Sequence, residues 1–161
     1  MPRSQTITTY LWFNGNAEQA VELYTSIFPN SRVTRVARWG EGGMAPAGSV
    51  MTVAFELDGQ GFIALNGGPE FPFTPAISLL ITCKTQADVD DRWARLIAGG
   101  GKPGRCGWLT DRFGVSWQVV PEGLGELMSD PDPKASGRVA RALMAMDKID
   151  IATLRQAREA A

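Results

Sequence analysis

The chain carries the same pattern of strands and one helix twice, and this repeat limits the folds that it can adopt. An apolar run rich in β-formers, Ile7 to Phe13, precedes a stretch with helical spacing of apolar residues. Laying residue 7 on residue 77 aligns this unit with a second one without a gap, so that Ile27 falls on Ile97. Short strand-to-strand connections follow each helix, which excludes a doubly wound sheet. The sequence therefore predicts two βαβββ modules, the second one shortened.

Gly and Pro mark where the expected elements end. Asn16 and Thr85 are the expected N-caps of the two module helices, and a Gly run from Gly99 ends the second helix. The expected strands are 7–13, 32–39, 49–57 and 62–65 in the first module, and 76–83, 107–109 and 115–120 in the second. After Pro121 we expect helices at 124–128, 136–145 and 151–161, whose apolar side chains cover either the chain's own sheet or a partner subunit.

These elements predict an α+β fold with a C-terminal helical extension. The paired modules, about 7–66 and 76–121, make one domain over residues 1–121, and residues 122–161 form the extension as part of the same unit. Apolar residues make up 44% of the chain, which is enough for a core.

The charges and the start of the chain exclude several classes of protein. There are 16 Lys and Arg residues against 17 Asp and Glu, so we expect no nucleic-acid partner. No apolar run approaches 18 residues, so we expect no membrane span. The opening MPRSQTITTY lacks the apolar stretch of a secretory signal, which favours a cytoplasmic location.

The chain contains no histidine, which restricts its chemistry more than any other count. This excludes Ser-His-Asp and Cys-His catalysis, His-based zinc sites and the two-His-one-carboxylate iron site. The two cysteines, Cys83 and Cys106, are not in a CxxC arrangement, and we expect buried reduced thiols. Cys106 is a candidate nucleophile only if Arg105, Arg112 or a helix end activates it.

Four segments carry a resemblance to a known family. They are YLWFNGNAEQAVELYTSIFPNS (10–31), ALNGGPEFPFTPAIS (64–78), CGWLTDRFGVSWQVVP (106–121) and MDKIDIATL (146–154). Together they resemble the PhnB-like family, also called 3-demethylubiquinone methyltransferases, of the vicinal-oxygen-chelate superfamily with the glyoxalase and bleomycin-resistance fold. The resemblance implies that the modules curve into a cupped sheet, and that the protein is a homodimer.

The superfamily's enzymes hold a divalent metal inside the cup with His and Glu side chains, as the resemblance implies. The matching strands of this chain offer poor ligands, among them Thr8, Tyr10, Asn66 and Ser78. The family pattern NGGPHF has a histidine where this chain has Glu70. We therefore expect no metal site and no cofactor, with a divalent ion held by Glu70 and Gln118 as the alternative.

The turn that begins at Asn66 is the main candidate for ligand contacts. Either its free N–H groups and Asn66 bind an oxygen-rich ligand, or its glycines serve only the crossover between modules. Glu70 is a candidate general base, or else an exposed loop residue. Asp111 is expected to hold a hairpin turn rather than to react.

Because Trp12 and Trp117 lie on strands that would line the cup, we expect some aromatic side chains to face a cavity. The predicted ligand-binding residues are Trp12, Trp39, Asn66, Gly67, Glu70, Phe71, Trp108, Trp117 and Gln118.

The function predicted from these features is the binding of a small, partly aromatic or apolar molecule in the cup. The first alternative is a metal-dependent lyase, isomerase or dioxygenase of the same superfamily. The second is a methyltransferase, which is disfavoured because the Gly-rich turn after Trp39 leads into a strand rather than a helix. Catalytic residues are not identified, with Glu70 and Cys106 as the only candidates.

Overall fold

The computed structural model describes residues 6–160, which divide after Phe73 into two compact units. The first unit contains one helix and four strands, and the second contains four strands and four helices. The elements of the first unit are β1 (Thr9–Phe13), α1 (Ala17–Ile27), β2 (Arg32–Arg38), β3 (Val50–Leu57) and β4 (Gln60–Asn66). Those of the second are β5 (Leu79–Cys83), α2 (Gln86–Ile97), β6 (Lys102–Pro103), β7 (Trp108–Thr110), β8 (Ser116–Pro121), α3 (Leu124–Met128), α4 (Pro133–Met144) and α5 (Ile151–Glu159).

The two units share one sheet topology. The strand order is β1-β4-β3-β2 in the first sheet and β5-β8-β7-β6 in the second. In each sheet the first strand pairs in parallel with the last, and the remaining pairs are antiparallel. When residue 7 is laid on residue 77, β1 aligns with β5, and the end of α1 aligns with the end of α2, as the repeat predicted. The predicted α+β fold with two βαβββ modules and C-terminal helices is confirmed.

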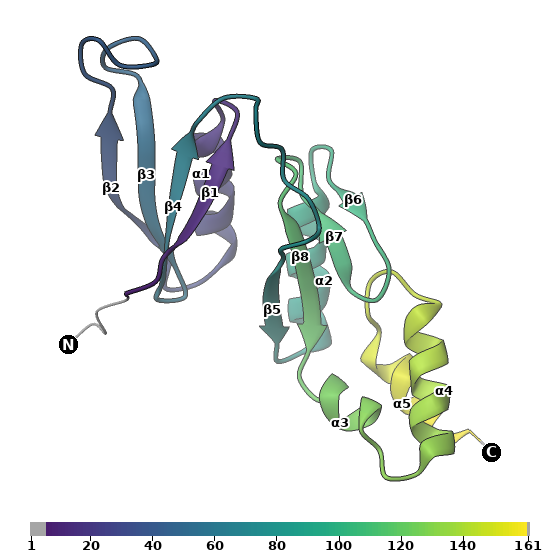
Figure 1. Cartoon of the computed structure of the whole chain (residues 1–161). Helices are drawn as coiled ribbons and strands as arrows, with labels where there is room; N and C mark the ends of the chain where they lie inside the picture. Colours follow the sequence, from purple (N-terminus) through teal and green to yellow (C-terminus); the bar gives the residue numbers. More distant parts are fainter. Residues whose placement is uncertain (1–5, 161) are drawn as a thin grey trace. The chain divides into compact units, whose positions relative to one another are not determined.

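In each unit the long helix covers one face of the sheet (Figure 1). Side chains alternate along a strand, so β1 turns Leu11 and Phe13 towards α1, where both are buried. Its other face carries Tyr10, which is 55% exposed, and the half-buried Trp12. Leu80 of β5 is 58% exposed in the same way, on the face that α2 does not cover. Each unit therefore has one packed and one uncovered sheet face.

The two long helices begin in different ways. Thr85 is the N-cap of α2 as predicted, and its side chain forms a capping box with Asp88. Asn16 stands at the N-cap position of α1, but its side chain makes no capping bond. The carboxamide of Asn66 accepts the hydrogen bond from Ala17 N instead, at 2.9 Å. The predicted role of Asn16 is therefore wrong, because a residue distant in sequence takes it.

The C-terminal helices form a core of their own within the second unit. Leu127, Val139, Ile149 and Leu154 are buried together, and each helix from α3 to α5 contributes to this cluster or to its margin. Segment 146–151, which precedes and begins α5, lies against the turn before β7: Cys106 N and Gly107 N donate to the carbonyls of residues 146 and 147. The extension thus packs on its own chain, and its contact with a partner subunit stays a prediction.

Several predicted boundaries differ from the observed ones. The apolar runs from residues 7 and 76 enter their strands only at Thr9 and Leu79. The helix predicted from residue 136 begins at Pro133, since Asp132 caps it and proline suits the first helical position. The short strand β6 was not predicted, because two residues carry no alternation. The predicted end of the last helix, Ala161, lies outside the described residues. Closure of the two units into one domain stays a prediction.

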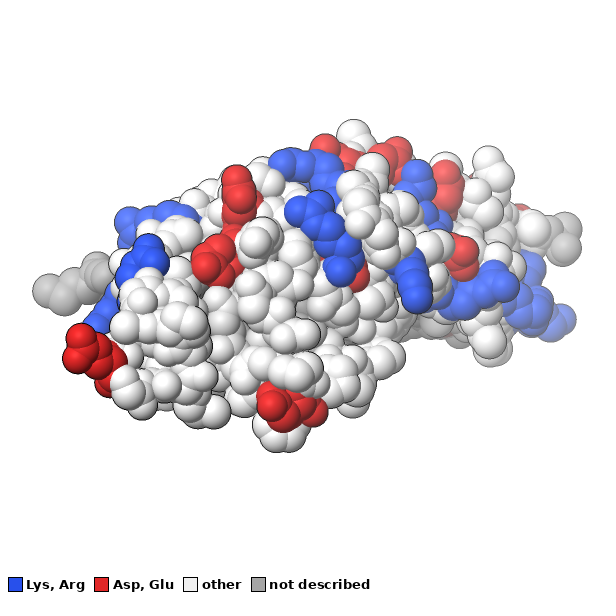
Figure 2. Space-filling model, turned by 90° about the horizontal axis from the view of Figure 1, so that it is seen from above, with Lys and Arg blue, Asp and Glu red and all other residues white. Residues whose placement is uncertain are grey.

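Acidic and basic side chains both occur on the face shown in Figure 2, as the nearly balanced counts imply. Across residues 6–160, no helix is long and apolar enough to cross a membrane.

Candidate functional site

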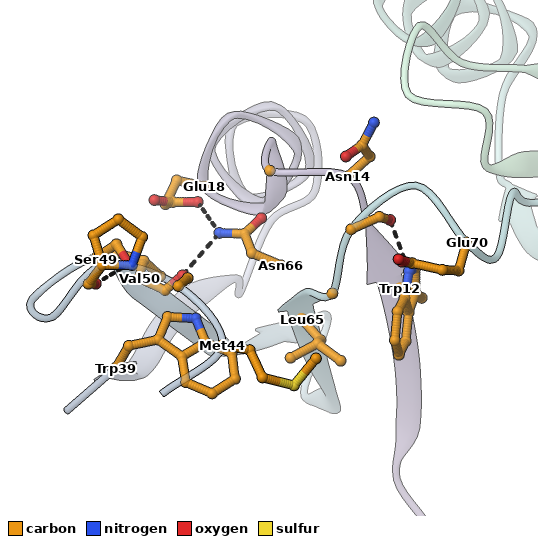
Figure 3. A pocket seen from close by; sticks show the side chains of 15 residues that line it. Trp12, Asn14, Glu18, Trp39, Met44, Ser49, Val50, Leu65, Asn66 and Glu70 are labelled. Carbon is orange, nitrogen blue, oxygen red and sulfur yellow. Dashed lines mark hydrogen bonds between the residues drawn. The ribbon is translucent and has the colours of Figure 1, made fainter. Parts of the chain in front are cut away.

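A cavity of about 650 Å³ lies in the first unit, at the end of the sheet where the loop between β2 and β3 approaches the start of α1 (Figure 3). Its lining comes from β1, the N-terminal end of α1, the loop of residues 39–49, the end of β4 and the turn after it. The residues labelled in the figure are Trp12, Asn14, Glu18, Trp39, Met44, Ser49, Val50, Leu65, Asn66 and Glu70.

The walls of the cavity are mainly apolar. Trp12 is fixed on the uncovered face of β1, because its indole N–H donates to Gly68 O at 2.9 Å and Phe71 meets its ring edge-on at 4.8 Å. Trp39 follows β2, and its backbone holds the base of the loop through bonds with Gly48 and Ser49. Met44, at the tip of this loop, is 89% exposed. The cavity is thus bordered by a fixed tryptophan on one side and a loop on the other.

Asn66 ties three elements together beneath the cavity. Its oxygen accepts from Ala17 N, while its NH2 group donates to the Glu18 carboxylate at 2.8 Å and to Val50 O at 3.1 Å. The side chain thereby joins β4, the start of α1 and the start of β3. We conclude that Asn66 shapes the cavity, and that its amide is already engaged.

The glycines after Asn66 are also engaged structurally. The N–H groups of Gly67 and Gly68 both donate to Phe13 O, at 2.9 and 3.3 Å. A Cβ on Gly67 would collide with the Trp12 ring, and Gly68 has a φ of 107°. Of the two interpretations of this turn, the structural one agrees with these bonds, and the free N–H groups needed for an oxygen-rich ligand are missing at both glycines.

Glu70 lies at the cavity beside Trp12 (Figure 3). Among the described residues its carboxylate has no hydrogen-bond or ion-pair partner, and the side chain is exposed. Glu18 is the other carboxylate of the lining. The structure thus brings together Trp12, Trp39, Asn66, Gly67 and Glu70 of the predicted set in one cavity, with Phe71 against Trp12.

The remaining predicted residues, Trp108, Trp117 and Gln118, belong to the second unit. Trp108 and Gln118 are paired across β7 and β8 on the face that α2 leaves uncovered, and Gln118 donates to Ser78 at 2.9 Å. Trp117 faces the other way, where it is 2% exposed. The prediction that Trp117 lines the cup is therefore wrong: one residue along a strand separates the two faces.

Asp111 explains why Trp117 is held on the buried face. Its carboxylate accepts from the Trp117 indole N–H at 2.9 Å, and from Phe113 N and Val115 N in the hairpin turn. The side chain is 3% exposed. The predicted structural role of Asp111 is confirmed. Its carboxylate also binds the Trp117 indole, which was not predicted.

Neither cysteine lies in a site suited to nucleophilic chemistry. Cys83 is buried, and this burial raises the pKa of its thiol to about 11, so the thiol stays protonated near neutrality. Cys106 has a φ of 58° in the turn before β7, and its sulfur lies 3.6 Å from Leu143 O. Arg105, a predicted activator, instead pairs with Asp147 and the carbonyl of Ala145.

The donor set does not fit the divalent metal that the superfamily implies. Nowhere between residues 6 and 160 do three His, Cys, Asp or Glu side chains gather closely enough to hold an ion. Of the two ligands in the metal alternative, Gln118 is engaged with Ser78, and Glu70 is a single carboxylate. These side chains therefore give no basis for a reaction step that runs through a metal.

Ten of the lining residues were not predicted, among them Asn14, Glu18 and Met44. Asn14 precedes α1 and Glu18 lies in its first turn, where the Asn66 side chain links Glu18 to the start of β3. Met44 lies in a Gly-rich loop whose composition indicates flexibility but does not predict which side chains the loop turns towards the cavity.

Comparison with known proteins assigns the family. The model of the 3-demethylubiquinone-9 3-methyltransferase family matches residues 5–120. The PhnB protein from Bacillus cereus is 37% identical, with a TM-score of 0.67, over 73% of this chain and 99% of that one. A Pseudomonas aeruginosa protein is 24% identical, with a TM-score of 0.60, over 74% of this chain and 98% of that one.

A fosfomycin resistance protein from Listeria monocytogenes is similar in fold alone. It is 14% identical, with a TM-score of 0.52, over 76% of this chain and 97% of that one. The comparison with curated proteins gives no match. The chain therefore belongs to the 3-demethylubiquinone-9 3-methyltransferase family, and it shares its fold with the fosfomycin resistance protein.

Proposed function

We propose that this chain is a small-molecule-binding protein that holds a partly aromatic or apolar ligand in the cavity of its first unit. The observation that carries the proposal is the cavity itself, about 650 Å³ and walled by Trp12, Trp39, Met44 and Leu65. Sites for small molecules fall in this size range and are lined mainly by apolar and aromatic groups. Two tryptophans offer a flat ligand a large contact area.

The loop of residues 39–49 gives the proposal its sharpest test. Met44 is exposed although it borders the cavity, so a ligand in the cavity would give its side chain new contacts. Met44→Ala is expected to weaken ligand binding by about three- to tenfold, the effect of losing a few apolar contacts. Met144→Ala is the matched control, because Met144 is an exposed methionine on α4, in the other unit.

Native mass spectrometry of the freshly purified chain is the first experiment. An organic adduct that persists in Met144→Ala and is reduced in Met44→Ala supports the proposal. Calorimetric titration with flat bicyclic compounds then measures the affinity. Absence of binding by every such compound, together with an adduct-free mass, contradicts the proposal.

The wider prediction is a ligand held by both modules, in contact with Trp108 and Gln118 of the second unit as well. Substitutions in each unit distinguish the two possibilities. If the ligand lies in the first-unit cavity alone, Trp39→Phe weakens binding and Trp108→Phe does not. If both substitutions weaken binding equally, the site includes the second sheet. Either result identifies the side chains that touch the ligand.

The metal-dependent alternative predicts a stoichiometric metal increment in the native mass and a gain of activity on adding a divalent ion. The family's name suggests methyl transfer, but the turn after Trp39 leads into β3, an antiparallel strand, rather than into a helix N-terminus. A methyltransferase would show a thermal shift with S-adenosylmethionine. No shift at saturating concentrations would retire that alternative.

We propose further that the protein is a homodimer. Tyr10 and Leu80 are apolar side chains exposed on uncovered sheet faces of the single chain, which a second copy of the chain would bury. A native mass of twice the chain mass supports this proposal. Tyr10→Asp is then expected to shift the population towards monomer, with the exposed Met144→Asp as control.

A further inference from the structure

We infer that the cavity selects a ligand bearing a positive charge or a strong hydrogen-bond donor over an anionic ligand. The inference rests on the proposed function, since it assigns the chemical class of molecule that the same cavity holds. It follows from which polar groups around the cavity are engaged and which remain available.

The donors at the floor of the cavity are already used within the fold. Gly67 N–H and Gly68 N–H bond to Phe13 O, and both donors of the Asn66 amide are taken by Glu18 and Val50. The Trp12 indole N–H donates to Gly68 O, and the Ser49 hydroxyl donates to Pro46 O. An anionic ligand would need such donors, because each carboxylate or phosphate oxygen loses its water on entering.

The acceptors, by contrast, are available. The Glu70 carboxylate makes no hydrogen bond within the described chain, and only one Glu18 oxygen, Oε2, receives one, from Asn66. Both carboxylates border the cavity. A ligand that brings a cationic N–H group therefore finds two carboxylates here. A ligand that brings only acceptors finds no cation, and the side-chain donors left to it among the described lining residues are the Asn14 amide and the Trp39 indole N–H.

The charges of the lining have one sign. Among the described residues, the lining includes Glu18 and Glu70 but no lysine or arginine. The nearest cationic side chain in sequence, Arg38, donates to Gly48 O, and neither residue belongs to the lining. The two tryptophan rings add to the preference, because a cation is attracted to an aromatic face whereas an anion is repelled.

Three naphthalene probes of similar shape test the inference: 1-naphthylmethylammonium, 1-naphthylmethanol and 1-naphthoate. Isothermal titration calorimetry measures the dissociation constant of each with the full chain. We expect the ammonium to bind more tightly than the alcohol by about two- to fivefold, the range for an exposed charge pair. The naphthoate is expected to bind most weakly. Raising the ionic strength from about 0.01 M to about 0.15 M should narrow these differences.

Glu70→Gln is the decisive variant, because among residues 6–160 the Glu70 carboxylate makes no hydrogen bond or ion pair. It should weaken binding of the ammonium more than binding of the alcohol, because only the ammonium loses a charge pair. Glu22→Gln, an exposed carboxylate of α1 outside the lining, should change neither. Equal binding of ammonium and alcohol, or tighter binding of naphthoate, overturns the inference and leaves the proposed function standing. If no probe binds, the proposed function and this inference fail together.

Discussion

The two units are built from the same module, yet they differ where the first has its cavity. In the first unit, the loop before β3 and the start of α1 border an open space. In the second, segment 146–151 covers the corresponding elements, the turn before β7 and the start of α2. The same topology therefore borders a cavity in one copy and carries the chain's own C-terminal extension in the other.

The covering segment, residues 146–151, is held on the second unit by three kinds of contact. The Gln86 side chain donates to Ile149 O at 2.9 Å and accepts from Ile151 N at 3.0 Å. The Ile149 side chain is fully buried and lies where a Cβ on Gly107 would be. Lys148 pairs with Asp90 on α2. The Ile149 side chain thus fills space beside the turn before β7. The proposed ligand would fill space beside the corresponding loop of the first unit.

The largest expected effect comes from removing that isoleucine. Ile149→Ala should lower the free energy of unfolding by about 3 kcal/mol, because the buried side chain leaves a cavity behind. Hydrogen exchange followed by mass spectrometry locates the loss, which we expect in the second unit. Ile77→Ala is the matched control, since Ile77 is 75% exposed. Equal loss of hydrogen-exchange protection in the first unit would break the comparison, because it would mean that segment 146–151 stabilises both modules.

A smaller effect is expected from the anchor of the first unit. Asn66→Ala removes one acceptor and two donors and leaves Ala17 N without its cap, so we expect a loss of about 2 kcal/mol. Urea denaturation measures the change, and ligand titration should show weaker binding as well. Asn14→Ala also alters the lining, but it removes no side-chain hydrogen bond between described residues, so the free energy of unfolding should stay the same. A stable Asn66→Ala variant would refute the anchoring role.

The two helix starts sharpen the comparison further. Thr85→Ala should cost about 1 kcal/mol, because it removes the side chain of a capping box. Asn16→Ala should cost almost nothing, since the Asn16 side chain makes no capping bond. Thermal unfolding of the two variants checks the difference. Equal destabilisation would show that Asn16 has a role that its hydrogen bonds do not reveal.

These residues also show how far the sequence alone predicts the molecule. The repeat predicted both modules, because apolar spacing, glycine turns and the shared register are local signals. Thr85 was predicted correctly because its partner Asp88 is three residues away. Asn16 was not, because the cap of α1 comes from Asn66, which is brought there only by the pairing of β1 with β4.

The site was predicted less completely for the same reason. Trp12 and Trp39 were identified by residue type, but the face on which Trp117 lies depends on a shift of one residue along β8. Glu18 and Met44 were missed, since only the folded chain places the start of α1 beside a loop more than twenty positions away. Local signals thus predicted the elements, while long-range contacts decide which side chains share the cavity.

The smallest expected effect is a response to acid that distinguishes the units. The carboxyl groups with a lowered pKa, Asp88, Asp90, Asp130 and Asp150, lie in the second unit. Hydrogen bonds cause the shifts: the Thr85 side chain lowers the pKa of Asp88, Lys148 that of Asp90, and backbone N–H groups those of Asp130 and Asp150. Two of these groups, Asp90 and Asp150, hold the covering segment or begin the helix that follows it.

Since a lowered pKa means that the unfolded chain takes up protons first, these carboxylates stabilise the fold above their ordinary pKa of 3.8. Their contribution is lost as the pH falls through the lower folded values. Hydrogen exchange at decreasing pH, corrected for intrinsic rates, should therefore show the covering segment opening early. Asp150→Asn keeps a capping oxygen but does not titrate, so it should reduce the acid sensitivity while preserving α5. An unchanged acid response in this variant would assign the sensitivity to the other three carboxylates, and a first unit that opens earlier would reverse the comparison.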